Sequence, residues 1–187
     1  MSLPSSTVPD FTDPSLVSNY VETAPRKVPG FADLHLMALL LISERAAESA
    51  RILVLGAGGG LELRAFAEAR PRWSFVGVDP SQQMLDLATA TLGPLTDRIT
   101  LLAGHIDLAP RGLFDGATCL LTLHFLTRSE RLHTLMALRA RLKPGAPLVI
   151  AHHTCPDEGK ARLWMTRSAA FAAGPHADVE KAGASGK

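Results

Sequence analysis

The stretch 52-ILVLGAGGGLELRAFAE-68 carries the clearest structural signal in the chain. Four apolar residues run into a loop with four glycines, and a helical pattern begins directly after it. Such an apolar run is typical of a strand buried on both faces of a parallel sheet. In these sheets, the first strand–helix turn is where glycines let the backbone approach a ligand. The stretch therefore predicts a ligand site at the end of this strand.

The loop fits neither of the common phosphate-binding patterns. A GxGxxG fingerprint that begins at Gly56 requires a glycine where Leu61 stands, and no Lys-Ser/Thr pair of a P-loop follows. At the end of the next strand, 19 residues after Gly60, Asp79 offers a carboxylate for a ribose diol. The alternative is a plain turn with an Asp79 that only caps the next helix. The combined spacing favours a nucleoside without pyrophosphate, and S-adenosylmethionine (SAM) fits that description.

Elsewhere the chain alternates between strand and helix patterns, which predicts an α/β fold with a parallel sheet and helices on both faces. The break 25-PRKVPG-30 separates the first two helices, and the short link after the third strand predicts an irregular loop with about one helical turn. We expect strands over 51–56, 73–79, 98–104, 115–122 and 147–153, and helices over 14–23, 32–49, 61–69, 81–92, 129–142 and 157–173.

Two helices have a predicted buried face. In the helix over 32–49, this face holds Leu36, Leu39, Leu40 and residues 42–46. The helix over 129–142 begins with Ser129 as its N-cap. Its predicted buried face holds Leu132, Leu135, Met136 and Leu142.

Composition narrows the function classes. The chain has 187 residues, 47% hydrophobic and 20% charged, with a net charge of +1, so no basic field indicates nucleic acid or an anionic membrane. Cys119 and Cys155 are too few for a disulfide framework. The N-terminus does not read as a signal peptide, and the run 36-LMALLLI-42 is too short to span a bilayer. We expect a soluble, cytoplasmic protein.

These motifs resemble class I SAM-dependent methyltransferases over roughly residues 10–173. The glycine loop, 76-VGVDPSQQML-85, 103-AGHIDLAP-110 and 140-ARLKPGAPLVIAHH-153 carry the resemblance. It implies a Rossmann-like, doubly wound parallel sheet in the order 3-2-1-4-5, with the last two family strands absent. It also implies cofactor contacts from Gly56, Ala57, Gly58, Gly60, Asp79, Pro80, Met84, His105, Ile106 and Leu120.

We expect three parts in the chain. Composition predicts a mobile segment over residues 1–12 and a disordered tail over residues 174–187, and the resemblance implies a SAM-binding domain over residues 13–173. Within the domain, residues 13–49 form a helical lid over the cofactor.

Within the family, 26-RKVPGF-31 and 122-TLHFLTRSER-131 resemble carboxy-SAM synthases. That activity is not carried over, because it relies on an arginine in the C-terminal part that this sequence lacks. Four departures from the family each remove one polar contact, typically about 0.5–1.5 kcal/mol. Leu55 stands where the family usually has an acid, Phe31 replaces a tyrosine, His105 replaces the adenine-edge acid, and Leu120 replaces a polar residue.

The catalytic residue is less clear, because SAM is already activated and the enzyme mainly positions the acceptor. His124, just after the fourth strand, is the candidate general base or substrate contact, with simple packing as the alternative. His152, His153 and Cys155 would line a substrate pocket, and without a second ligand cluster they predict no metal.

The sequence leaves the roles of five further side chains open. Tyr20 and Phe31 are aromatic walls of the site or ordinary packing under the lid. Arg26 and Lys27 hold an acidic substrate or are a solvated pair. His35 is a packed or a surface residue.

We therefore expect a SAM-dependent methyltransferase acting on a small molecule. A carboxy-SAM synthase-like enzyme and a non-catalytic SAM-fold interaction module remain alternatives, and Leu61 disfavours a nucleotide-dependent oxidoreductase. The fifth strand would lie at an open sheet edge, and such edges invite pairing. We expect a homo-oligomer formed through this edge or through the final helix.

Overall fold

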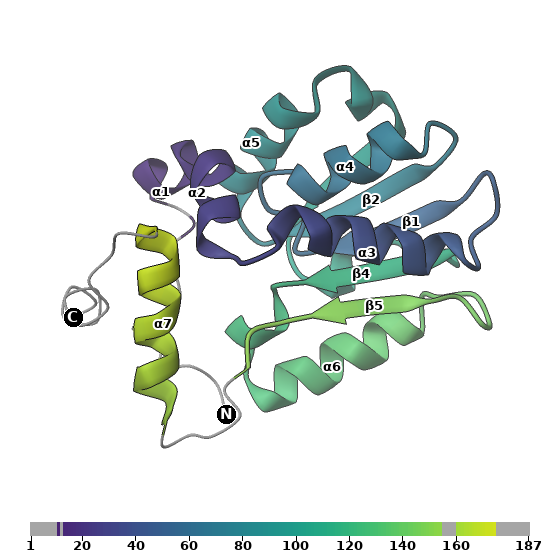
Figure 1. The fold of residues 1–187 in the computed structure, drawn as a ribbon. Helices are drawn as coiled ribbons and strands as arrows, with labels where there is room; N and C mark the ends of the chain where they lie inside the picture. Colours follow the sequence, from purple (N-terminus) through teal and green to yellow (C-terminus); the bar gives the residue numbers. More distant parts are fainter. Residues whose placement is uncertain (1–10, 12, 155–159, 175–187) are drawn as a thin grey trace.

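The computed structural model describes residues 11, 13–154 and 160–174. Five parallel strands form one sheet in the order β3-β2-β1-β4-β5 (Figure 1), which confirms the predicted fold class and strand order. The strands are β1 (Arg51–Leu55), β2 (Ser74–Asp79), β3 (Ile99–Ala103), β4 (Gly116–Leu120) and β5 (Leu148–Ala151).

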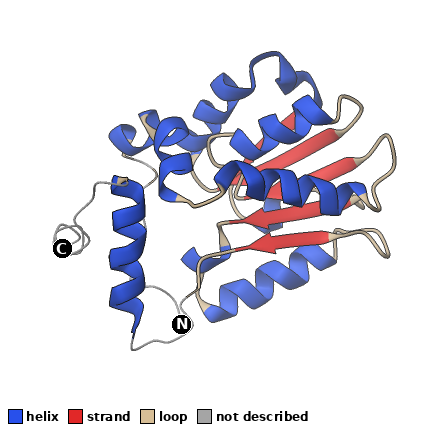
Figure 2. Ribbon diagram, in the orientation of Figure 1, coloured by secondary structure: helices blue, strands red, loops and turns tan. Residues whose placement is uncertain are grey.

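Helices cover both faces of the sheet (Figure 2). They are α1 (Pro14–Ser18), α2 (Tyr20–Lys27), α3 (Phe31–Ser43), α4 (Leu61–Ala69), α5 (Gln82–Leu92), α6 (Arg128–Arg139) and α7 (Ala161–Ala173). Short 3₁₀ turns span Gly93–Arg98, Ile106–Leu108 and Leu123–Phe125. The turn at Ile106–Leu108 is the single helical turn predicted for the link between β3 and β4.

The apolar run of β1 is explained by two hydrophobic clusters, one on each face of the sheet. Ile52 and Val54 belong to the cluster that α3, α4 and α5 cover. Leu53 and Leu55 belong to the cluster that α6 covers. Because successive side chains of a strand point to opposite faces, a central strand with two covered faces must be apolar at every position.

The N-terminal helix prediction is wrong in its boundaries. One helix over 14–23 is replaced by α1 and α2, which are separated at Asn19. The Asn19 side chain donates to the carbonyl of Ser15 (3.0 Å) and ends the first helix. Pro25 does not end the second helix, which continues to Lys27.

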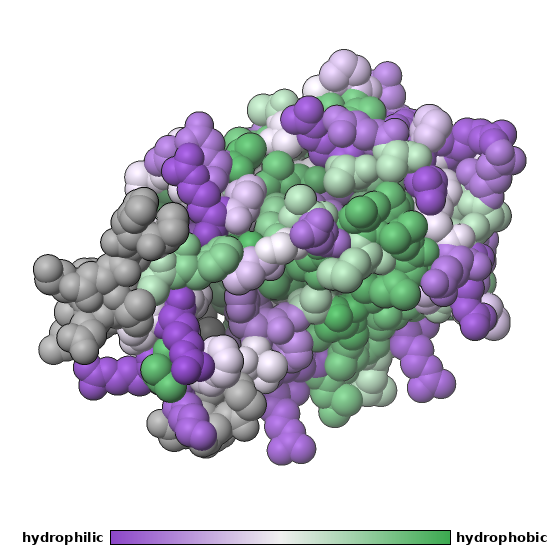
Figure 3. Space-filling view, viewed as in Figure 1, coloured by the Kyte–Doolittle hydropathy of each residue, from purple (hydrophilic) through white to green (hydrophobic). Residues whose placement is uncertain are grey.

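The helix predicted over 32–49 ends early, at Ser43, and only part of its predicted face is buried. Leu39 and Ile42 lie in the core, whereas Leu36 and Leu40 are 55% and 53% exposed. Met37 and Leu41 are exposed beside them, and hydrophobic atoms gather over α3 in Figure 3. A helix that is apolar on most sides gives no sequence signal for the side that faces the sheet.

The prediction for α6 is wrong at its cap and holds only in part on its face. Thr127, not Ser129, is the N-cap, and it forms a capping box with Glu130.

On the predicted face of α6, Leu135 and Leu142 pack against the core, whereas Leu132 and Met136 are more than 60% exposed. The buried residues of the helix are Thr134 and Leu138. Several apolar residues spaced around the helix made the inward face ambiguous in the sequence.

The β5 edge is open in the part of the chain that the structure describes, because β5 pairs only with β4. Within the same residues, α7 lies beside α2, away from the sheet (Figure 1). The predicted start of this last helix at Asp157 falls outside the described residues, as do the predicted terminal segments apart from Phe11 and Gly174. A search of the described residues finds no helix with the length and apolar character of a membrane span.

The capping box gives a test of the α6 assignment. The Glu130 carboxylate accepts from the Thr127 amide (2.7 Å), and the Thr127 hydroxyl accepts from the Glu130 amide (3.4 Å). Thr127→Ala should lower the free energy of unfolding by about 1 kcal/mol. Ser129→Ala, two residues on, should change it by less than about 0.5 kcal/mol in the same urea titration. A larger loss from Ser129→Ala would contradict this assignment.

Candidate functional site

The glycine loop, residues 56–60, joins β1 to α4 at the carboxyl ends of the central strands. Gly56 and Gly60 have φ values of +80° and +81°, which side chains disfavour. A Cβ on Gly56 would overlap the Thr122 hydroxyl, and one on Gly60 would lie 3.0 Å from Ala88. These two positions therefore lack side chains because Thr122, just after β4, and Ala88 of α5 approach them closely.

Asp79 faces this loop, as the sequence predicted. The Gly58 amide donates to Oδ2 of Asp79 (2.9 Å), and the Ser81 amide donates to Oδ1 (3.0 Å). The amides of Gly56 and Ala57 both donate to the Val78 carbonyl (2.8 and 3.1 Å), so the loop is tied to the end of β2.

The Asp79 carboxylate is buried, and burial is the largest influence on its pKa. Burial raises this pKa, whereas the hydrogen bonds from Ser81 and Gly58 and the charge of His105 act to lower it. The net pKa is raised. A carboxylate held this way keeps acceptor capacity on both oxygens for a further donor.

The other predicted cofactor contacts lie at different depths around the loop. The Met84 side chain is buried, and its methyl lies 3.6 Å from where a Gly58 Cβ would be. Pro80 and His105 are exposed at the rim. Ile106 and Leu120 are buried in the two clusters on opposite faces of the sheet, so they form the floor of the region.

A row of aromatic rings crosses the strand ends above the loop. The Tyr20 ring lies against Gly58 and Gly59. The Phe11 ring packs edge to face on Tyr20 and Phe125, with ring centroids 6.3 and 5.9 Å apart. The Ser81 hydroxyl donates a hydrogen bond to the Phe11 carbonyl (2.7 Å). Burial, followed by the charges of Asp79 and Glu62, raises the pKa of Tyr20 to about 12. Phe11 and Tyr20 thus cover the glycine loop, and no sequence signal predicted the hydrogen bond from Ser81 to Phe11.

His124 is buried beside this row. Its ring packs against the rings of Phe125 and His153, with centroids 4.1 and 4.9 Å apart. Its Nδ1 atom has no hydrogen-bond partner among the described residues. Burial, followed by the neighbouring charges of His153, His152 and Arg131, lowers its pKa to about 4. The imidazole is therefore neutral at pH 7, and the lowered pKa makes it a weaker base than an ordinary histidine.

The remaining candidates separate into buried and exposed side chains. His35 is buried against Phe31 in α3, so its packed interpretation holds and Phe31 is part of the same packing. Arg26, Lys27, His152 and His153 are exposed. Cys155 lies outside the described residues, and within those residues no group of three metal-ligating side chains occurs.

Sequence reasoning missed a second buried carboxylate, that of Glu62 in the first turn of α4. The residue is 6% exposed and its Oε1 has no hydrogen-bond partner among the described residues. Burial raises its pKa to about 7, and the Thr118 side chain acts to lower it, although the Thr118 hydroxyl is not in hydrogen-bond geometry with any described group. Acidic residues are common in the first turn of a helix, so no pattern in the chain singles out Glu62.

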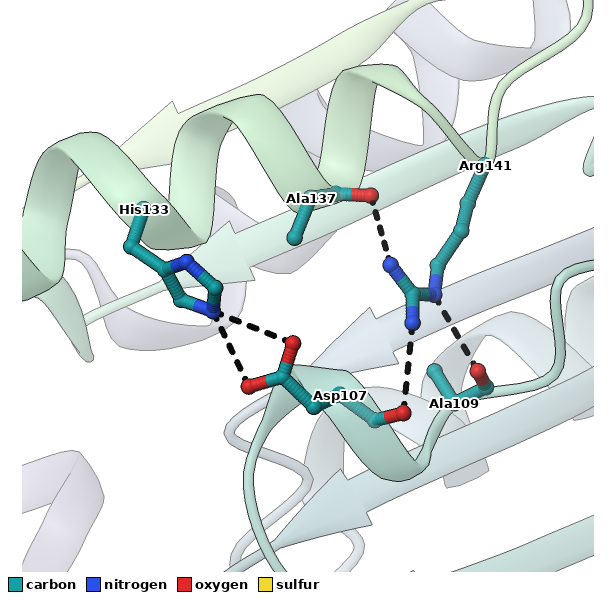
Figure 4. A network of polar contacts seen from close by, with 5 residues as sticks. All are labelled: Asp107, Ala109, His133, Ala137 and Arg141. Atoms are coloured by element: carbon teal, nitrogen blue, oxygen red, sulfur yellow. Dashed lines mark hydrogen bonds and ion pairs between the residues drawn. The ribbon is translucent and has the colours of Figure 1, made fainter.

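A polar network holds the β3–β4 link against α6 (Figure 4). The His133 ring contacts both Asp107 oxygens (3.0 and 2.9 Å). The buried Arg141 guanidinium donates to the carbonyls of Ala109, Ala137 and Asp107. This network fixes the chain next to His105 and Ile106, and its role is structural.

Two surface hollows, of about 290 and 320 Å³, lie at the opposite end of the sheet. Their lining residues, such as Trp73 and Asp115, directly precede strands. Ligands of open parallel sheets bind beyond the carboxyl ends instead, where the aromatic row covers the glycine loop.

The profile of a family described as a methyltransferase domain matches residues 53–148, a little over half of the chain. The chain belongs to this methyltransferase domain family. The matched range begins in β1 and ends at the start of β5, so it includes the glycine loop, Asp79 and His124.

Among curated relatives, a carboxy-SAM synthase of Chromohalobacter salexigens is 28% identical over 172 residues, which are 88% of this chain and 63% of the relative. A ubiquinone/menaquinone biosynthesis C-methyltransferase of Syntrophotalea carbinolica is 31% identical over 59% of this chain and 46% of the relative. The chain thus spans less than two thirds of the length of these relatives.

Among solved structures, a SAM-bound amino pentose methyltransferase of Micromonospora echinaspora is similar with a TM-score of 0.63 and 28% identity, over 73% of this chain and 57% of that protein. An O-methyltransferase family protein of Burkholderia thailandensis has a TM-score of 0.65 at 16% identity, over 86% of this chain and 48% of that protein. The second likeness concerns the fold alone.

The raised pKa of Glu62 predicts a pH-dependent stability. The group is more protonated when folded, so its contribution is fully present below its ordinary pKa near 4.5 and is lost as the pH rises through about 7. From pH 4.5 to 8, the wild type should lose on the order of 3 kcal/mol relative to Glu62→Gln, measured by urea unfolding. Parallel pH profiles of the two proteins would show that this carboxyl is not perturbed.

Proposed function

We propose that the chain binds SAM beside the glycine loop and transfers its methyl group to a small-molecule acceptor. The observation that carries this proposal is the buried Asp79 carboxylate that accepts the Gly58 amide at 2.9 Å. A carboxylate at this place can accept both hydroxyls of a ribose. Membership of the methyltransferase domain family and the likeness to a SAM-bound methyltransferase support the same conclusion.

Around this contact, we assign the predicted cofactor residues by depth. Gly56, Ala57, Gly58 and Gly60 let the adenosine approach the backbone. His105 and Pro80 bound the base at the rim, and Met84, Ile106 and Leu120 supply an apolar floor. The aromatic row above the loop implies that the segment with Phe11 and Tyr20 moves aside to admit the cofactor, as a lid does.

For catalysis, His124 is the proposed general base. Its imidazole is neutral at physiological pH and has an unpartnered Nδ1. Methyl transfer from a sulfonium needs a base only when the acceptor is a protonated oxygen or nitrogen, so this role implies an O–H or N–H acceptor. Phe11 and Phe125 keep the surroundings apolar and exclude water.

A carboxy-SAM synthase-like activity is the second candidate. Three carboxy-SAM synthases are 24–28% identical over at least 80% of this chain. Mass spectrometry of the small molecule that co-purifies distinguishes the candidates, since carboxy-SAM favours the second and SAM or its demethylated product favours the first. A non-catalytic module is a third candidate, motivated by the departures at Leu55, His105 and Leu120, and calorimetry without heat at high micromolar SAM would support it.

We also propose that copies of the chain associate through the β5 edge or α7. The unpaired side of β5 and the exposed Trp164 and Phe171 of α7 support this proposal. The near-neutral net charge of the chain disfavours a nucleic-acid partner. The small-molecule acceptor and the cytoplasmic location stay predictions.

Replacing the ribose acceptor tests the cofactor assignment. Asp79→Ala should weaken SAM binding at least about 100-fold in calorimetry, because two hydrogen bonds to a charged acceptor are lost. Asp86→Asn is the matched control, since its exposed carboxylate in the neighbouring α5 bonds only to Gln82 among the described contacts. Unchanged SAM affinity in a folded Asp79→Ala variant would remove the assignment.

The protonation state of His124 can be observed directly. In NMR spectra of protein labelled in its histidine rings, the His124 signals should stay those of a neutral imidazole down to about pH 5, because its pKa is lowered to about 4. His124→Asn identifies the signals, since it removes them from the spectrum. A midpoint near the ordinary histidine value of about 6.5 would exclude a desolvated base.

A further inference from the structure

Glu62 is a buried carboxylate that the fold does not satisfy. Glu62 lies in the first turn of α4, two residues after Gly60. Gly60 is the N-cap residue of this helix and caps it with no side chain. The Oε1 atom of Glu62 has neither a hydrogen-bond donor nor a cation among the described residues. A buried acceptor without a partner costs about 1–3 kcal/mol, more when charged, so a fold that retains one has a use for it.

A second orphaned polar atom lies next to it. Thr118, in the middle of β4, is fully buried and its Oγ1 has no partner among the described residues. Thr118 lowers the pKa of Glu62 by a hydrogen-bonding influence of its side chain, so the two groups are neighbours, although their oxygens are not in good hydrogen-bond geometry. Thr118 pairs with Val54 of β1, which places both orphans where β1 and β4 lead to the glycine loop.

The charge of Glu62 reaches the ligand side of the site. After burial and Asp79, Glu62 is the third influence that raises the pKa of Tyr20, whose ring lies on Gly58 and Gly59. The charge of Glu62 also raises the pKa of the Cys119 thiol in β4, second only to burial. Tyr20 therefore lies within electrostatic range of both carboxylates, Asp79 and Glu62.

The two orphans define what they would bind. The Glu62 carboxylate only accepts, so it needs an N–H or O–H donor and favours a cation, and the Thr118 hydroxyl oxygen can accept from the same donor group. A sulfonium has no hydrogen to donate, and one carboxylate with one hydroxyl is too small a set for a metal ion. A primary ammonium has three donors and a compact charge, so it can satisfy both oxygens at once.

We infer that Glu62 and Thr118 together receive the α-ammonium group of the cofactor's amino-acid end. This inference rests on the proposed function, because it presumes SAM in the site. Asp79 then holds the ribose and Glu62 the amino acid. Glu62 acts by positioning the cofactor, and it forms or breaks no covalent bond.

Two simpler roles compete with this one. Glu62 can serve only the start of α4, where an acid favours the positive end of the helix dipole. A buried water can bridge the Glu62 and Thr118 oxygens. Either role concerns the protein alone, so it predicts no dependence on which end of the cofactor is present.

The experiment compares two ligands that differ in the amino-acid end. SAM carries the ammonium, whereas 5′-methylthioadenosine keeps the adenosine and lacks the amino acid. Calorimetry is performed on the wild type, Glu62→Gln and Thr118→Val. Glu68→Gln is the matched control, because it makes the same change in the same helix at an exposed ion pair with Arg64.

Glu62→Gln should weaken SAM binding about 10- to 100-fold and leave 5′-methylthioadenosine within about 2-fold, since only the charge-assisted contact is lost. Thr118→Val should show the same preference with a smaller loss, and Glu68→Gln should bind both ligands like the wild type. Thermal unfolding of each variant confirms that it is folded. Glutamine resembles the protonated form that Glu62 adopts at low pH, so this variant should fold.

Each other outcome has one meaning. If Glu62→Gln binds SAM as tightly as the wild type, the ammonium assignment fails and the proposed function stands. If it weakens both ligands equally, Glu62 is a structural residue and the assignment again fails. If the wild type binds neither ligand, the proposed function fails and this inference fails with it.

Discussion

The site depends on one hydrogen bond, from the Gly58 amide to the Asp79 carboxylate. It joins the loop after β1 to the end of β2, and those strands are neighbours in the sheet. Because burial raises the pKa of Asp79 despite two amide hydrogen bonds, desolvation outweighs them. The protein thus keeps a dehydrated carboxylate in a fixed orientation, and a ligand with two hydroxyls would recover part of the cost of its burial.

Local signals predicted the centre of the fold well. The apolar run of β1 and the helix over 61–69 follow from short-range patterns, and the strand order follows from the family resemblance. Boundaries failed where local signals were ambiguous: α3 is apolar on most sides, and Thr127 and Ser129 are both good caps. Thr127 prevails because Glu130, three residues on, completes its capping box.

The site was predictable only where it lies on one motif. The glycines and Asp79 have a fixed spacing in the chain, so they could be found. The covering of the loop by Phe11 and Tyr20, and the approach of Glu62 to Thr118, join segments far apart in sequence. Such contacts are set by how α2 and α4 pack on the strand ends, and no pattern in the chain encodes that packing.

The two carboxylates also bear on which cofactor class the site favours. Asp79 and Glu62 both lie within electrostatic range of Tyr20, and no arginine or lysine among the described residues pairs with either of them. A dinucleotide would bring a pyrophosphate with two negative charges into this dry region, where repulsion is weakly screened. SAM brings two cationic groups and one carboxylate, so its net charge is positive. An acid that binds the ribose also occurs in dinucleotide sites. It is therefore the second carboxylate, Glu62, that disfavours the nucleotide-dependent oxidoreductase for a reason independent of Leu61.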